Sequence, residues 1–269
     1  MIRFFGLLLA GALALSPQSL QAQTLLDAGY HQMYDLNFEG AHRSFQQWMR
    51  EHPEDAMGPV SDAAAYEFAE FDRLHILQSE FFLHDTFLKE RPAADPQARS
   101  AFDAATERGR KAAEATLQRD PRNPDARLAS ALRSGLRADY LGLIDKKYLA
   151  SLTEMKAGRA VAEALIADHP EMGDAYLAIG VENYVLSQKV APVRWLLRFG
   201  GAQTDYERGV RNVTLTAERG HYLAPYARVL LAVAALRDNN TPRARRLLSE
   251  LVNQYPHNPL YQQELSRLH

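Results

Sequence analysis

The stretch AHRSFQQWMREHP at residues 41–53 decides the fold, because its spacing returns three more times along the 269-residue chain. A small residue is followed by mostly apolar residues four and seven positions later, and by Pro twelve positions later. Offsets of four and seven positions correspond to one and two turns of a helix, so the three residues lie on one buried stripe. The Pro helps to end the helix because it cannot donate the next helical hydrogen bond. The four copies are Ala41-Phe45-Trp48-Pro53, Gly109-Ala113-Thr116-Pro121, Gly158-Ala162-Leu165-Pro170 and Ala244-Leu248-Leu251-Pro256.

A new helix is expected to begin soon after three of these Pro residues. Pro121 is followed by Asn123-Pro124, Pro256 by Asn258-Pro259, and Pro170 by Asp174. Asn, Asp and Pro are the residues that open helices. The composition agrees, since 41 Ala and 37 Leu favour helix over sheet. Cys is absent, which excludes disulfides, Cys-ligated metal sites and a thiol nucleophile.

The repeated pattern resembles the tetratricopeptide repeat, a helix–turn–helix unit of 34 residues. That family carries Gly or Ala near the middle of its first helix, where Gly29, Gly180 and Ala232 stand here. The first two copies lie 68 residues apart, twice the family's period, but the next two gaps are 49 and 86 residues. The resemblance implies an all-α, right-handed solenoid of antiparallel helix pairs that is irregular and holds inserted helices. It says almost nothing about a ligand.

The turn signals divide the chain into thirteen expected helices within a single repeat domain that covers residues 23–269. No linker rich in Gly, Ser or Pro separates a second domain. The expected helices are 24–36, 38–52, 60–72, 74–89, 97–119, 124–139, 146–168, 173–188, 191–199, 203–219, 222–238, 242–255 and 258–267.

Residues 1–22 are typical of a secretory signal peptide. Arg3 is followed by an apolar run over residues 4–15 and by Ala22 before a plausible cleavage site. The apolar run is short for a membrane span, which needs about 20 residues. An uncleaved anchor is the alternative. Cleavage predicts a mature chain that begins near Gln23 and lies in the periplasm or outside the cell.

The charge and the histidines give no sign of nucleic acid, a cofactor or a metal. The net charge is −2, whereas nucleic-acid-binding proteins carry a basic face. None of the nine His residues stands three or four positions from another, so no helix presents a pair of His ligands to a metal. Neither a phosphate-binding loop nor a dinucleotide fingerprint is present.

Residues 61–90 are acidic and aromatic. Seven carboxylates stand among two basic residues and five Phe residues. Three interpretations remain open: a groove for a basic, apolar peptide, the site of a helical enzyme such as a hydrolase, or a pair of helices with a Phe core and a solvated acidic face. The last is the usual outcome for a run of surface charge.

Residues 190–199 combine a broad apolar face with two Arg residues four positions apart. This pattern is typical of a helix that binds a partner protein or a membrane surface. A short helix that caps the core is the alternative, and a buried Trp195 would distinguish it. The candidate interaction residues are Arg194, Trp195, Arg198 and Phe199.

Together these features predict an exported scaffold that binds a protein or peptide and catalyses no reaction. The resemblance implies that the inner helix of each pair lines a concave binding face. Tyr, Met and Arg suit such a face because they combine contact area with polar groups. The candidate partner-binding residues are Tyr30, Met33, Tyr34, Tyr184, Tyr226 and Arg237, with Leu26, Leu177, Val181, Val185, Val229 and Val233 between them. A helical enzyme and a peripheral membrane component are the alternatives.

Overall fold

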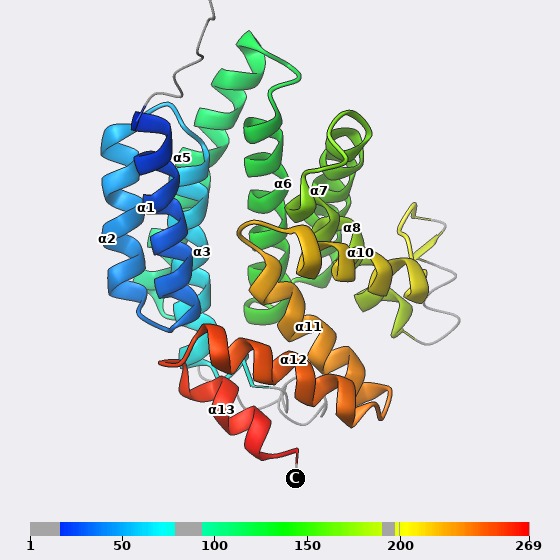
Figure 1. Ribbon diagram of the computed structural model, residues 1–269. Coiled ribbons are helices and arrows are strands. Elements are labelled where there is room, and N and C mark those ends of the chain that lie inside the picture. Colours follow the sequence, from blue (N-terminus) through cyan, green and yellow to red (C-terminus); the bar gives the residue numbers. More distant parts are fainter. Residues whose placement is uncertain (1–16, 79–92, 190–196, 199, 269) are drawn as a thin grey trace, which may run out of the picture.

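The computed structural model describes residues 17–78, 93–189, 197–198 and 200–268, and eleven α-helices within them form five antiparallel pairs and a last helix (Figure 1). The all-α array of helix pairs expected from the sequence is confirmed. The pairs are α1 (Pro17–Tyr34) with α2 (Phe38–Glu51), α3 (Met57–Arg73) with α5 (Pro96–Arg119), α6 (Pro124–Asp139) with α7 (Tyr148–Asp168), α8 (Tyr176–Ser187) with α10 (Tyr206–Arg219), and α11 (Ala224–Arg237) with α12 (Thr241–Gln254), followed by α13 (Pro259–Ser266). A 3-10 turn, Gly173–Ala175, precedes α8, and a π-helical turn, Tyr140–Ile144, follows α6.

The repeated stripe packs where two helices meet, as its spacing predicts. Its first residue is buried in all four copies, and Ala41 and Ala244 have no exposed surface. The helix ends repeat as well. The residue that precedes each Pro donates its backbone N–H to the carbonyl of the stripe's third residue, over 2.7 or 2.8 Å, in the pairs His52–Trp48, Asp120–Thr116, His169–Leu165 and Tyr255–Leu251.

A fifth copy lies in α10 and was missed in the sequence, because His221 stands where the other copies have Pro. It reads Gly209-Val213-Thr216, and the Gly220 N–H again donates to the Thr216 carbonyl, over 2.8 Å. A Cβ at Gly209 would lie 2.6 Å from the backbone N of Tyr184 in α8. Only glycine permits this approach of the two backbones.

The prediction of a helix over residues 74–89 is wrong for residues 74–78, and residues 79–89 lie outside the described residues. The chain turns after α3, and His75 adopts a positive φ of 59°. Leu74 and Ile76 are both buried against Phe71, while His75 between them is exposed. Alternate burial of this kind places both apolar side chains in the core, which a continued helix could not do. Most of the helix expected at 191–199 lies outside the described residues.

The array curls until its last pair meets its first. The Asn258 side-chain amide donates to the Tyr34 carbonyl over 2.8 Å, and the Tyr34 hydroxyl donates to the Tyr222 carbonyl over 3.0 Å. The rings of Tyr30 and Tyr222 stack with centroids 4.7 Å apart. In Figure 1, α12 and α13 accordingly lie beneath α1, at the end where α1 stops. The face that an open solenoid would expose therefore becomes part of the interior.

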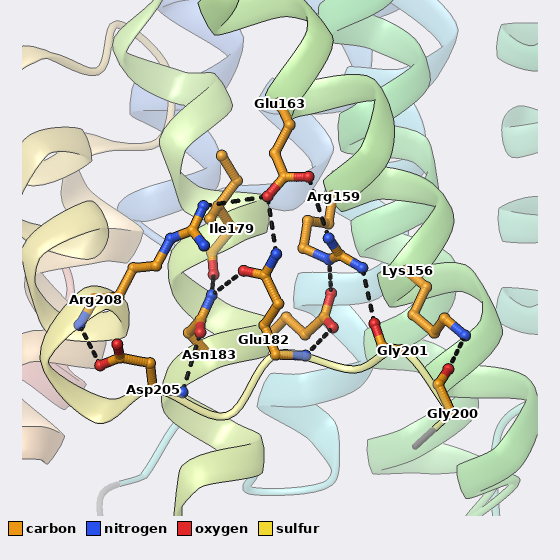
Figure 2. A network of polar contacts seen from close by, with 11 residues as sticks. Lys156, Arg159, Glu163, Ile179, Glu182, Asn183, Gly200, Gly201, Asp205 and Arg208 are labelled. Carbon is orange, nitrogen blue, oxygen red and sulfur yellow. Dashed lines mark hydrogen bonds and ion pairs between the residues drawn. The ribbon is translucent and has the colours of Figure 1, made fainter. Parts of the chain in front are cut away.

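A buried polar network fastens residues 200–205 to α7 and α8 (Figure 2). Glu182 has no exposed surface; it accepts from Arg159 Nε over 2.8 Å and from the Gln203 backbone over 3.0 Å. Asn183, equally buried, accepts from the Asp205 backbone over 3.1 Å. The guanidinium of Arg159 also donates to the Gly201 carbonyl, over 3.1 Å. Because these buried groups are all paired, the network fixes one path for this loop.

Candidate functional site

Two largely apolar cavities lie between the inner helices. The central cavity has a volume of about 80 Å³ and is enclosed by α1, α3, α6, α7, α8 and α11. The second cavity, of about 50 Å³, lies toward α12 and α13. Four side chains border both cavities: Met33, Tyr34, Phe68 and Tyr226. A concave, apolar space with few polar groups is the usual form of a binding site, so the central cavity is the candidate site.

Most of the candidate partner-binding residues converge on these cavities. Tyr30, Met33 and Tyr34 are at most 4% exposed, and Tyr226 is half-buried. Tyr222 and Asn258, which precede α11 and α13, hydrogen-bond to Tyr34 at the end of α1, so the candidate residues of α1 are buried where an open concave face was expected. Their role in binding a partner stays a prediction.

Tyr184 and Arg237 lie in a different place. Tyr184 is buried, and its ring packs against Tyr206 with centroids 5.8 Å apart. Burial raises the pKa of the Tyr184 phenol, and the nearby charge of the exposed Arg237 partly offsets that rise. The structure therefore brings these two candidates together, away from the residues that border the cavities.

The candidate interaction helix is described only in part. Arg198 is exposed, and its Nε donates to the Thr204 hydroxyl over 2.7 Å. Arg194, Trp195 and Phe199 lie outside the described residues. Both interpretations of this segment, as a core cap or as an interaction surface, stay predictions.

The central cavity contains a pair of carboxyl groups that the sequence did not single out as a pair. Glu67 is 1% exposed, and its Oε1 has no hydrogen-bond partner. Asp139 accepts from the Tyr226 hydroxyl over 3.3 Å. Burial raises the pKa of Glu67 well above its usual value, the charge of Asp139 adds to this, and burial raises the pKa of Asp139 to about 7. The π-helical turn that starts at Tyr140 is a feature often found at functional sites.

Two further acidic residues of α3, Asp62 and Glu70, are buried and so do not belong to a solvated acidic face. Asp62, 2% exposed, accepts from His42 Nδ1 over 2.6 Å. Glu70, also 2% exposed, pairs with Arg73 over 2.6 Å and accepts from the Asp95 backbone over 2.9 Å. These two carboxyl groups have partners in the fold, whereas Glu67 does not have one for Oε1. The reason is that α3 is packed between α2, α5, α1 and α6.

Gly135 leaves room in the wall of the central cavity. A Cβ at this position would meet no heavy atom within 4 Å. Glycine inside a helix is less stable than alanine by about 0.5–1 kcal/mol. Gly135→Ala should therefore raise the free energy of unfolding by about that amount, measured by chemical denaturation. A destabilised variant would mean that the space beside Gly135 is filled.

The pKa of Asp139 predicts a pH dependence. The carboxyl of an unfolded chain ionises near pH 3.9, whereas that of the folded chain ionises near 7, so the folded state holds a proton that the unfolded state loses. This contribution to stability is intact below about pH 4 and is lost as the pH rises toward 7. Asp139→Asn should raise the free energy of unfolding by roughly 2 kcal/mol at pH 7, a value discounted for partial exposure, and change it little at pH 4. Denaturation of both proteins at the two pH values checks this; equal differences at both would contradict it.

Within the residues that the structure describes, no three His, Asp or Glu side chains gather as metal ligands would. In the same residues, no helix combines the length and apolar character that crossing a membrane requires.

Comparison with known proteins adds little beyond the fold. No family model matches the chain, and no curated protein does. Among solved structures, the chain is similar to a thermophilic TPR protein of Thermus thermophilus, with 13% sequence identity and a TM-score of 0.46 over 92% of this chain and 98% of that one. The structure itself shows an all-α array of antiparallel helix pairs in the described residues, and the residues of the site carry the functional interpretation.

Proposed function

We propose that this protein is an exported scaffold that binds a protein or peptide partner and neither makes nor breaks a covalent bond. The observation that carries the proposal is the central cavity. Its walls come from six helices, and four residues suited to binding, Tyr30, Met33, Tyr34 and Tyr226, border it. A side chain of the partner would occupy the cavity, and the surrounding repeats would supply the remaining contact area.

Export rests on residues 1–22, which have the pattern of a secretory signal. The mature protein should begin near Gln23 and be recovered from outside the cytoplasm. N-terminal sequencing of the protein purified from its own cells tests this. A folded product that still begins at Met1 would contradict it.

Affinity capture with a cavity-filling variant tests partner binding. Gly135→Leu places a bulky side chain where the wall is open, so it should prevent the partner's side chain from entering while the fold persists. Ala115→Leu introduces the same residue on the exposed face of α5 and serves as the control. A partner that is retained by the wild type and by the control, but lost with Gly135→Leu, supports the proposal. Equal capture by all three proteins would contradict it.

The hydrolase alternative has one observation in its favour. The buried Asp62 holds Nδ1 of the half-buried His42 at 2.6 Å, as in sites where a carboxylate orients a general base. The His42 ring also lies against Tyr66, with centroids 4.0 Å apart. Hydrolysis of a panel of ester and amide substrates that disappears with His42→Gln would favour this alternative. Equal turnover by the wild type and the variant would exclude His42 as the base.

A further inference from the structure

We infer that the central cavity is a binding site for a primary ammonium group at the end of a short alkyl chain. The site is built from Glu67 and Asp139 at its polar end and from apolar and aromatic side chains elsewhere. It stands independently of the partner-binding proposal, because a free amine would bind whether or not the protein is a scaffold.

Charge is the first argument. The described residues that line the central cavity include two carboxyl groups and no Lys, Arg or His. The other titratable groups in this lining are the phenols of Tyr30 and Tyr34 on α1 and of Tyr226 on α11. Burial raises the pKa of each phenol, so all three are neutral at physiological pH. A cation is therefore the ligand charge that these walls complement.

The unpaired carboxylate oxygen of Glu67 favours a cation that carries N–H donors. Glu67 Oε1 is buried and has no donor in the fold, although a buried polar atom left unpaired costs about 1–3 kcal/mol. A primary ammonium brings three donors, enough for Glu67 and Asp139 together. A quaternary ammonium brings none and would leave Oε1 unpaired.

Aromatic rings make the apolar part of the cavity suitable for a cation. Phe68 packs edge-to-face with Tyr34, with centroids 5.8 Å apart, and with Tyr226, with centroids 5.5 Å apart. Ring faces attract cations, most strongly where water is excluded. These rings come from three helices, α1, α3 and α11, and they border the same cavity as the two carboxyl groups.

The volume of the cavity limits the width and length of the alkyl chain that it can hold. An apolar cavity of about 150 Å³ admits benzene. The central cavity, at about 80 Å³, suits a narrower group such as a chain of a few methylenes. Gly135 keeps part of the wall free of side-chain atoms, at a cost in helix stability that a bound ligand would explain.

Binding should release protons, which gives the site a signature that simple burial of an alkyl chain lacks. Burial raises the pKa of both carboxyl groups, and the pKa of Asp139, about 7, leaves this group largely protonated near pH 6. An ammonium favours the ionised carboxylates, so its binding lowers their pKa values and expels protons. A primary amine stays charged up to about pH 10. Affinity should therefore rise from pH 6 to pH 8.

Two sources supply this chemistry: a free alkylamine and the lysine side chain of a partner. Calorimetric titration of the full mature protein with n-butylamine and with N-acetyl-lysine amide distinguishes them. Binding of butylamine alone identifies a free-amine site, and binding of both identifies a site that accepts lysine. Either result supports the inference, and binding of neither overturns it.

Four variants test the residues. Glu67→Gln and Asp139→Asn keep the side-chain shapes but remove the charge, so each should weaken butylamine binding at pH 8 at least tenfold. Gly135→Leu should abolish binding, and Ala115→Leu should leave it unchanged. Thermal melting verifies that each variant is folded. Unchanged affinity in both carboxyl variants, or in Gly135→Leu, would overturn the inference, since Gly135→Leu adds volume where the wall is open and keeps the carboxyl pair.

Butyltrimethylammonium is the matched ligand control. It carries the same charge and chain but no N–H donor, so it should bind at least tenfold more weakly than butylamine. Equal or tighter binding would overturn the assignment of a primary ammonium.

Discussion

Ala41→Arg should lower the free energy of unfolding by about 3 kcal/mol or more. Ala41 is the first residue of the repeated stripe in α2 and has no exposed surface. The space around this helix is filled: even a Cβ at Gly29, on the facing α1, would come within 2.3 Å of the Phe45 ring. A long charged side chain at Ala41 would therefore both overpack the contact and bury a charge without a partner.

Gln46→Arg is the control for this substitution, because Gln46 lies on the exposed face of the same helix. It should change the stability by less than about 0.5 kcal/mol. Chemical denaturation of both variants makes the comparison. Equal stability of Ala41→Arg and Gln46→Arg would show that the register assigned to the repeats is wrong.

Glu182→Ala should lower the free energy of unfolding by about 3 kcal/mol, because two donors lose a buried acceptor. Arg159, 14% exposed, would lose one of its two carboxylate partners and keep Glu163 at 3.1 Å, and the Gln203 backbone N–H would lose its acceptor. Both donors bond to the one carboxylate, and Figure 2 shows Arg159 directed at Glu182, so a single substitution releases both. Residues 200–205 should then exchange their amide hydrogens faster than in the wild type.

The matched control is Glu207→Ala. Glu207 also pairs with an arginine, Arg211, over 3.4 Å, but its side chain is 84% exposed. An exposed pair of this kind contributes at most about 1 kcal/mol. If the two variants lost the same small amount of stability, the network around Glu182 would contribute no more than a surface ion pair.

The fold was predictable from the sequence to the extent that local patterns determine it. The stripe that begins at Ala41 marks a helix, its buried face and its end, and all three are seen in the structure. The copy that begins at Gly209 was not predicted because the pattern required a Pro after the helix. In this copy Gly220 ends the helix instead. The turn at His75 was not predicted, because no residue type there indicates that a non-glycine residue adopts a positive φ.

The candidate site was predictable only in part. The heptad-like spacing of Tyr30, Met33 and Tyr34 identifies the inner face of α1, and these residues do border the central cavity. Closure of the array depends on small rotations summed over five helix pairs, which no single stretch of sequence encodes. Glu67 and Asp139 belong to helices that are far apart in the chain, so no local sequence motif predicts that they form a pair.

The meeting of the first and last pairs makes the inner face into an interior. Asp27 and His221 are on the surface and touch at 2.7 Å, although 194 positions separate them. Since the chain has no Cys, the double variant Asp27→Cys/His221→Cys carries only the two introduced thiols. A short bis-maleimide should link them within one molecule in the native protein, and neither in denaturant nor in the single variants. Failure to crosslink in the folded double variant would show that the array is open and that its inner face is exposed to solvent.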